Sequence, residues 1–220
     1  MRGASEAAGR DPAHVTLLAV SKTFPAAQVL EAIAAGQHGF GENYLQEALD
    51  KIADIKAALP DTHVEWHFIG PIQSNKTRSI AASFDWVHTV ERLKVAERLS
   101  AQRPAGLPPL NICIQVNISG EASKSGAAPG ELLALARQVA LLPNLNLRGL
   151  MAIPAPEQDG AKQRAAFARV RALADVLRED GLQIDTLSMG MSADMAAAIA
   201  EGATIVRVGS AIFGDRGTPH

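Results

Sequence analysis

LLAVSK, at residues 17–22, is the end of a short apolar run that stops at a lysine. The run covers residues 15–20 and is bounded by Pro12 and Pro25. A continuous apolar run of this length is typical of a strand that is buried on both faces in a parallel sheet. We therefore expect Lys22 at the point where this strand leaves the core.

An amine at the rim of an apolar interior has a distinct chemistry. Because the ammonium form of Lys22 loses hydration there, we expect its pKa to fall below the usual value of about 10.4. The free amine is then available to form a Schiff base with a carbonyl compound. The alternative is a lysine that extends to solvent or pairs with a carboxylate, and this stretch alone does not separate the two.

The overall composition is that of a globular protein. The chain has 220 residues, of which 47% are hydrophobic and 20% charged, and this length fits one α/β barrel or two smaller domains. A formal net charge of −2 provides no positive surface for nucleic acid or an anionic membrane. No apolar run approaches the roughly 20 residues of a membrane span. We expect neither nucleic acid nor a membrane as a partner.

The single cysteine, Cys113, lies in the apolar stretch 110–116. We expect a buried, unreactive thiol at this position, because there is neither a disulfide framework nor a zinc-binding spacing. The N-terminus has no apolar segment of the kind found in a secretion signal. These features predict a cytoplasmic protein without a metal site.

Short apolar stretches alternate with helical stretches along the whole chain, as is typical of βα units on a parallel sheet. Eight such units predict a single (β/α)8 TIM barrel, an α/β fold that spans residues 1–220 as one domain. A doubly wound open sheet is the alternative. The Pro-rich connector 104–109 reads as an ordinary loop, because the same alternation continues beyond it. The predicted strands are residues 15–20, 38–42, 64–69, 84–90, 110–116, 145–153, 187–190 and 204–208.

Barrels of this kind carry their chemistry at the C-terminal ends of the strands. Polar and glycine residues gather at these ends in the sequence, whereas the opposite ends carry nothing comparable. The residues at these ends are Lys22, Asn43, Gly70, Asn117, Met189 and Gly209.

Two turns with glycine and serine follow the seventh and eighth strands. Residues 188–192, Ser-Met-Gly-Met-Ser, precede a helix that we expect to start at Ser192, and residues 208–214 follow the last strand in the same way. Backbone N–H groups at such turns form anion sites. Turns after strands seven and eight are the usual phosphate position of this barrel class. Taken alone, each turn also fits a simple helix cap.

Arg207 lies in the last strand between Val206 and Val208, so its side chain faces the opposite way from theirs. A guanidinium that points into a barrel mouth is costly unless it is paired. Its partner is either a carboxylate such as Glu42 or a bound anion. His67 alternates with a carboxylate on the third strand, and a lone strand histidine is more often a core residue than a base.

Six stretches together resemble the pyridoxal phosphate homeostasis protein family. They occur in the family's order along nearly the whole chain. The stretches are LLAVSKTFP (17–25), FGENYLQE (40–47), WHFIGPIQSNK (66–76), VNISGEASKSG (116–126), LRGLMAIP (147–154) and LSMGMSADMAAAIAEGATIVRVGSAIFG (187–214).

The resemblance implies a barrel like the N-terminal domain of alanine racemase, with pyridoxal 5′-phosphate (PLP) held as a Schiff base on Lys22. It also implies that Arg207 faces the pyridine nitrogen and that Asn43 lies near the ring. The phosphate is expected to be held by Ser192, Gly209 and Ser210, with backbone near Met189. The family usually carries about one more helix before its first strand, so a shorter start would loosen the bottom of the barrel or an N-terminal packing surface.

The resemblance further implies a protein that controls free PLP levels with little or no turnover. A ring nitrogen that faces a guanidinium stays unprotonated, which weakens the ring as an electron sink. A PLP-dependent amino-acid racemase or lyase is the first alternative. A metal-free aldolase that uses Lys22 with a sugar phosphate is the second. We expect a monomer that makes transient contact with PLP-dependent apoenzymes.

Overall fold

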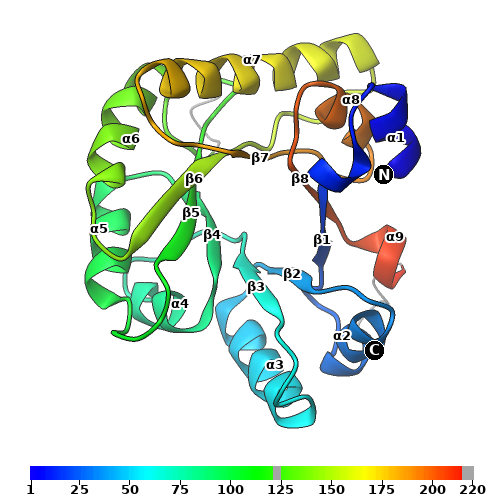
Figure 1. The fold of residues 1–220 in the computed structure, drawn as a ribbon, viewed down its shortest axis with the longest axis vertical. Helices are drawn as coiled ribbons and strands as arrows, with labels where there is room; N and C mark the ends of the chain where they lie inside the picture. The colour runs from blue at the N-terminus through cyan, green and yellow to red at the C-terminus, as the bar shows by residue number, and fades with distance from the viewer. Residues whose placement is uncertain (121–124, 215–220) are drawn as a thin grey trace.

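The computed structural model of the chain is a closed barrel of eight parallel strands (Figure 1). It describes residues 1–120 and 125–214. The strands follow one another around the barrel in sequence order, and β8 (Ile205–Val208) closes it by pairing with β1 (Thr16–Val20). The predicted (β/α)8 barrel is thus confirmed, and the doubly wound open sheet is wrong.

The strands lie close to their predicted positions. Seven of them fall within the predicted ranges, whereas β7 starts one residue earlier and ends two residues earlier than expected, because Met189 and Gly190 already belong to the turn that follows. The remaining strands are β2 (Gly39–Glu42), β3 (Glu65–Phe68), β4 (Trp86–Val90), β5 (Leu110–Gln115), β6 (Leu145–Met151) and β7 (Thr186–Ser188).

Helices surround the barrel and connect successive strands (Figure 1). Within the described residues, no helix combines the length and the apolar character needed to cross a membrane. The helices are α1 (Arg2–Ala7), α2 (Ala26–Ala34), α3 (Leu45–Ala58), α4 (Thr77–Ser83), α5 (Leu93–Gln102), α6 (Leu132–Ala140), α7 (Gly160–Glu179), α8 (Met195–Ala200) and α9 (Ser210–Phe213), with 3₁₀ turns at Pro12–His14 and Pro129–Glu131.

Helix α8 starts later than the sequence predicted. The expected start was Ser192, but the helix begins at Met195. Residues 191–194 form a turn instead, because the Asp194 carboxylate accepts a hydrogen bond from the Met191 N–H at 2.6 Å and the Asp194 N–H donates to the Met191 carbonyl at 3.1 Å. This turn lies at the C-terminal end of the barrel, next to β7.

Alternation along each strand divides the buried side chains between two cores. In β8, Val206 belongs to the large core between the sheet and the helices, while Ile205 faces the barrel interior. The interior also holds Cys113, which is fully buried, and burial raises the pKa of this thiol to about 12. The expected burial of this thiol is therefore confirmed. The small apolar cluster of the interior comprises Leu18, Trp86, Cys113, Met151 and Ile205.

The segment before β1 is attached to helix α8. Helix α1 packs against α8 (Figure 1), and the guanidinium of Arg10 donates hydrogen bonds to the carbonyls of Ile199 and Ala203 at 2.8 and 2.7 Å. Ile199 lies in the last turn of α8, and Ala203 lies in the loop that joins α8 to β8. The N-terminal segment thus fixes the helix that carries the turn 191–194.

Candidate functional site

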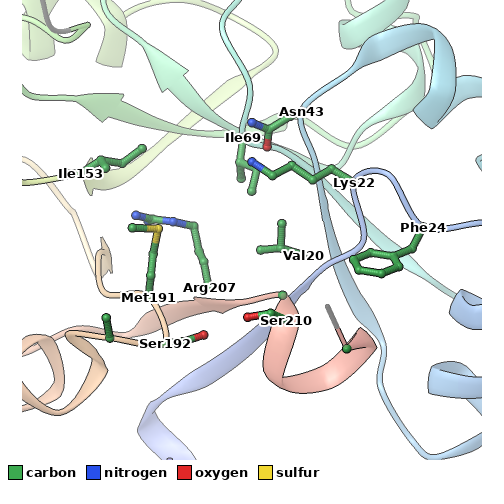
Figure 2. Close-up of a pocket in the computed structure, with 13 residues that line it drawn as sticks. Val20, Lys22, Phe24, Asn43, Ile69, Ile153, Met191, Ser192, Arg207 and Ser210 are labelled. Atoms are coloured by element: carbon green, nitrogen blue, oxygen red, sulfur yellow. The ribbon is translucent and has the colours of Figure 1, made fainter. Parts of the chain in front are cut away.

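A pocket of about 330 Å³ opens at the C-terminal ends of the strands (Figure 2). Its volume lies in the range of small-molecule sites. Its apolar wall includes Phe24, Ile69, Ile153 and Met191, none of which the sequence analysis singled out. Six of the seven predicted site residues line it, namely Lys22, Asn43, Ser192, Arg207, Gly209 and Ser210.

Lys22 extends into the pocket from the end of β1, and Figure 2 shows its side chain directed toward Asn43. Its neighbours in the chain fix its position. The Ser21 hydroxyl is buried and donates to Glu42 Oε1 at 2.6 Å. The Thr23 N–H donates to Glu47 Oε1 at 2.6 Å, and Thr23 has a φ of 69°, a left-handed conformation that turns the chain directly after Lys22. The lysine is therefore presented by a constrained turn.

Asn43 follows β2 and contributes a polar atom that the protein leaves unsatisfied. Its Oδ1 is buried and accepts no hydrogen bond within the described part of the chain. Gly70 packs directly against its backbone, since a Cβ at Gly70 would lie 2.2 Å from the Asn43 carbonyl oxygen. Because an unsatisfied buried acceptor is costly, Asn43 is a position at which a ligand could donate a hydrogen bond.

Arg207 enters the pocket from β8 and is 4% exposed. Its guanidinium donates to the Ser188 carbonyl at 2.8 Å, to Ser188 Oγ at 2.7 Å and to the Ala152 carbonyl at 3.0 Å. All three acceptors are neutral. Burial lowers the pKa of Arg207 to about 10, so the side chain remains a cation at neutral pH.

Glu42 does not provide the carboxylate partner that the sequence suggested for Arg207. Glu42 is fully buried, but its Oε1 accepts from Lys51 Nζ at 2.6 Å and from Ser21. This alternative for Arg207 is wrong, because Lys51 reaches Glu42 from helix α3. Among the described residues, no carboxylate forms an ion pair with Arg207.

The two glycine turns after β7 and β8 line one side of the pocket. Gly190 has a φ of 96°, and a Cβ there would lie 2.5 Å from Ala198 Cβ, so the turn requires glycine. Gly209 precedes α9 and its carbonyl accepts from the Ile212 and Phe213 N–H groups. The first N–H groups of a helix have no partner within it. The N–H groups at the start of α9 and the hydroxyls of Ser192 and Ser210 together make this side of the pocket suitable for an anion.

Met189 is the predicted site residue that does not reach the pocket. Its side chain is completely buried in the core, and its N–H donates to the Ile205 carbonyl at 3.1 Å. Met191, two residues further on, lines the pocket instead and is 43% exposed. Alternation from β7 places Met189 away from the pocket, and the turn that begins at Gly190 brings Met191 into it.

The pocket is electropositive. It is lined by the cationic side chain of Arg207 and by Lys22, and no acidic residue of the described chain belongs to its lining. With the turns on one side and the unsatisfied Asn43 oxygen on another, the pocket suits a small anionic ligand that carries a hydrogen-bond donor.

Comparison with known proteins agrees with this geometry. The family model for the alanine racemase N-terminal domain matches residues 5–217. The pyridoxal phosphate homeostasis protein of Pseudomonas aeruginosa is 66% identical over 216 residues, which cover 98% of this chain and 91% of that protein. The chain belongs to the pyridoxal phosphate homeostasis protein family. The protein of that name from Escherichia coli K12 is 57% identical over 94% of this chain and 88% of its own length.

Solved structures show the same barrel in this family. PipY of Synechococcus elongatus, solved with PLP bound, is 40% identical, with a TM-score of 0.83 over 97% of this chain and 98% of that one. Alanine racemase from Corynebacterium glutamicum is 23% identical, with a TM-score of 0.67 over 100% of this chain and 61% of that chain. The latter likeness concerns the fold alone.

Proposed function

We propose that the protein binds PLP reversibly in this pocket and takes part in controlling its free concentration. The observation that carries the proposal is the buried guanidinium of Arg207, which only neutral oxygens hold and which lies in the same pocket as Lys22. A cation left without a carboxylate partner favours an anionic ligand. The name of the Pseudomonas aeruginosa relative and the PLP bound to PipY support PLP as that ligand.

The residues present fit this cofactor. When bound, PLP supplies an aldehyde that condenses with an amine and a ring that can accept electrons. In our proposal Lys22 provides the amine as a reversible Schiff base, and Arg207 faces the ring nitrogen. Asn43 accepts a hydrogen bond beside the ring. The phosphate is held by Ser192, Gly209 and Ser210, together with backbone near Met189.

We propose little or no turnover for the same reasons. Arg207 donates toward the ring nitrogen, and a guanidinium does not provide the negative charge that would keep this nitrogen protonated. The only tyrosine, Tyr44, is 54% exposed and lies outside the described lining of the pocket, so it does not provide an acid or base opposite Lys22. A PLP-dependent racemase or lyase remains the alternative.

The first experiment is the absorbance spectrum of the purified protein, followed by borohydride reduction and peptide mapping by mass spectrometry. We expect a Schiff-base band and a reduced phosphopyridoxyl group on Lys22. Lys22→Ala should lose both, whereas the matched control Lys56→Ala, on the exposed side of α3, should retain them. A protein that stays colourless and unmodified with excess PLP would refute the proposal.

A second experiment separates the carrier from the enzyme. The loaded protein is incubated with amino acids in deuterated water, and exchange at the α-hydrogen is followed by mass spectrometry. We expect no sustained exchange above that of Lys22→Ala. Steady exchange that requires Lys22 would favour the racemase or lyase.

The partners and the location form part of the same proposal. We propose a cytoplasmic monomer that makes transient contact with PLP-dependent apoenzymes when it releases the cofactor. Light scattering after size exclusion tests the monomer. Activation of a PLP-dependent apoenzyme by the loaded protein, at a rate above that of free PLP release, tests the contact.

A further inference from the structure

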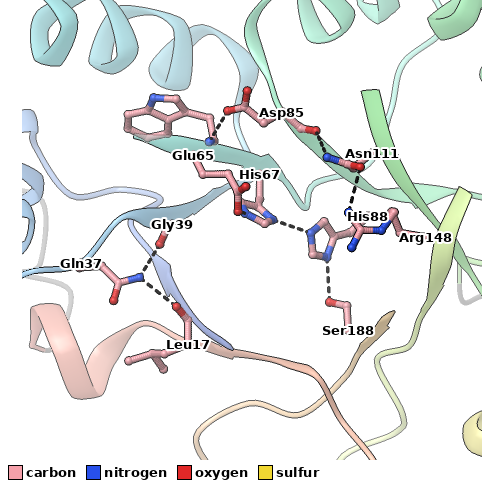
Figure 3. A network of polar contacts seen from close by, with 11 residues as sticks. Leu17, Gln37, Gly39, Glu65, His67, Asp85, His88, Asn111, Arg148 and Ser188 are labelled. Carbon is pink, nitrogen blue, oxygen red and sulfur yellow. Dashed lines mark hydrogen bonds and ion pairs between the residues drawn. The ribbon is translucent and has the colours of Figure 1, made fainter. Parts of the chain in front are cut away.

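A continuous chain of polar side chains crosses the interior of the barrel from Glu65 to Ser188 (Figure 3). Ser188 in turn accepts a hydrogen bond from Arg207. Glu65 Oε1 lies 2.8 Å from His67 Nε2, and His67 Nδ1 lies 2.8 Å from His88 Nε2. His88 Nδ1 lies 2.8 Å from Ser188 Oγ, which accepts a hydrogen bond from Arg207 at 2.7 Å. The chain thus joins the residue that begins β3 to a residue of the pocket.

The positions of these residues place the two ends of the chain at opposite ends of the barrel. Glu65 is the first residue of β3, and its side chain is 40% exposed. His67, His88 and Ser188 are almost completely buried. The exposed end is therefore at the N-terminal mouth, while the other end is at the C-terminal mouth, where the pocket lies.

If both rings are neutral, the hydrogen-bonding groups permit one arrangement of the protons. The hydrogen bond from His67 keeps the pKa of Glu65 below its usual value, so Glu65 is an ionised acceptor. His67 Nε2 must then donate, and in a neutral ring its Nδ1 must accept. Burial lowers the pKa of His88 well below its usual value, so the His88 ring is neutral.

The remaining bonds follow from the same rule. His88 donates from Nε2 to His67 and accepts at Nδ1 from the Ser188 hydroxyl. The hydroxyl proton is therefore committed to His88, which leaves an oxygen lone pair of Ser188 to accept from Arg207. Each donor has an acceptor, and the order of the bonds is determined by the ionised carboxylate of Glu65.

We propose that Glu65, His67, His88 and Ser188, here called the interior relay, position Arg207 in the pocket by directing the Ser188 hydroxyl proton to His88, so that His88 does not compete with Arg207 as a donor to the Ser188 oxygen. The other acceptors of Arg207 are backbone carbonyls. Ser188 is thus the side chain through which the interior acts on the guanidinium. The consequence for PLP rests on the proposed function, whereas the arrangement of the relay does not.

Packing alone does not explain the relay. The ring of His67 stacks on Trp86 at 5.4 Å and 8°, so an apolar side chain would also find a packing partner there. The barrel interior already contains an apolar cluster that fills part of this space. A buried polar network is costly unless every member is satisfied, and the interior relay satisfies both rings completely.

The first test measures the histidine tautomers without any cofactor. Long-range ¹H–¹⁵N NMR of the ¹⁵N-labelled protein distinguishes Nδ1–H from Nε2–H rings. We expect both His67 and His88 to carry the proton on Nε2. In Glu65→Leu the terminal acceptor is lost, so both rings should shift toward the Nδ1–H form. Glu65→Gln retains an acceptor oxygen and should keep the Nε2–H form.

A matched control lies at the same mouth of the barrel. Asp185 is a carboxylate that pairs with Arg148 at 2.7 Å and does not belong to the interior relay. Asp185→Asn should leave both tautomers unchanged. An Nδ1–H ring at His88 in the unsubstituted protein, or tautomers that Glu65→Leu leaves unchanged, would overturn the relay.

The second test measures the effect on the pocket through the spectrum and affinity of added PLP. We expect Glu65→Leu to shift the absorbance of the bound cofactor and to weaken binding about fivefold, since His88 Nδ1–H then becomes a second donor to Ser188 Oγ and weakens the hydrogen bond that Arg207 donates to the same oxygen. Glu65→Gln should resemble the unsubstituted protein. Ser188→Ala should give the same shift while the histidines stay Nε2–H, because Glu65 still orders them.

The two tests fail separately. If the unsubstituted protein takes up no PLP, the proposed function falls, while the tautomers still decide whether the relay exists. If PLP binds with identical spectra and affinities in Glu65→Leu, Ser188→Ala and the unsubstituted protein, the positioning role is overturned although the cofactor site stands.

Discussion

Two of the buried cations, Lys51 and Arg207, are treated differently by the protein. Lys51 and Arg207 are each 4% exposed. Lys51 lies 2.6 Å from Glu42 Oε1 and 3.0 Å from Glu47 Oε1, and it also donates to the Ser21 carbonyl at 2.8 Å. Arg207, in contrast, is held by neutral oxygens. One cation is neutralised by the protein, and the other is not.

The difference separates a structural charge from a charge that is available to a ligand. Lys51 joins helix α3 to the ends of β1 and β2 and so supports the turn that carries Lys22. Its carboxylate partners leave it little attraction for another anion. Because three neutral dipoles hold Arg207 in place without cancelling its charge, the field of this guanidinium extends into the pocket.

The largest expected effect comes from removing the carboxylate of the neutralised cation. Glu42→Leu leaves Lys51 buried without its closest counter-charge, and we expect a loss of about 3–5 kcal/mol in the free energy of unfolding. Urea denaturation followed by circular dichroism measures this loss. The double variant Glu42→Leu/Lys51→Met removes both charges and should recover most of it. Equal losses in the single and double variants would show that the pair is not the cause.

An intermediate effect on the free energy of unfolding is expected from acid, because protonation of His88 would bury a second positive charge near Arg207. Burial, followed by the neighbouring His67 and Arg207, lowers the pKa of His88 well below 6.5. As the pH falls through about 6.5, His88 therefore binds a proton in the unfolded chain before it does so in the folded protein. The contribution of His88 to the free energy of unfolding is fully present above that pH and decreases below it. The free energy of unfolding should then fall with pH at a slope that approaches about 1.4 kcal/mol per pH unit.

Replacement of His88 isolates this contribution. In His88→Asn the decrease in unfolding free energy between about pH 6.5 and 5.5 should be smaller than in the unsubstituted protein by roughly 1 kcal/mol. His38→Asn, at a solvent-exposed position, is the matched control and should retain the slope. Parallel stability curves for His88→Asn and the unsubstituted protein would contradict a buried neutral ring.

The smallest effect on stability is expected at Arg207 itself. Arg207→Met removes a buried charge that has no counter-charge, and the Ser188 carbonyl keeps the hydrogen bond that it accepts from the Ala152 N–H at 3.1 Å. The lost hydrogen bonds and the relieved burial of charge should nearly cancel, so we expect a change of about 1 kcal/mol or less. Urea denaturation checks this value. A loss as large as that of Glu42→Leu would mean that Arg207 is a structural cation too.

The fold was accessible from the sequence because it depends on local patterns. Apolar runs such as residues 15–20 identified the strands, and their regular alternation with helices identified the barrel. Alternation along β8 also predicted that Arg207 faces away from Val206. Arg207 lines the pocket, whereas Val206 belongs to the large core. Where a turn interrupts the pattern, alternation no longer identifies the side chain that faces the pocket: the Met189 side chain is buried in the core, and Met191 lines the pocket.

The partners of the buried polar groups were not accessible in the same way. A strand pattern gives the face on which a side chain lies but not the residue opposite it on another element. The sequence therefore suggested Glu42 for Arg207 and could not anticipate Lys51, which comes from helix α3. It likewise treated His67 as an isolated core histidine, since its bond to His88 depends on how β3 and β4 are aligned.

Cys113 gives the protein a built-in reporter of its own opening. It is the only cysteine of the chain, it is completely buried inside the barrel, and its raised pKa keeps the thiol protonated at neutral pH. A thiol reagent can therefore label the native protein only when strands separate and admit it. The rate of labelling measures how often the barrel opens, and a ligand that holds the strand ends together would slow it.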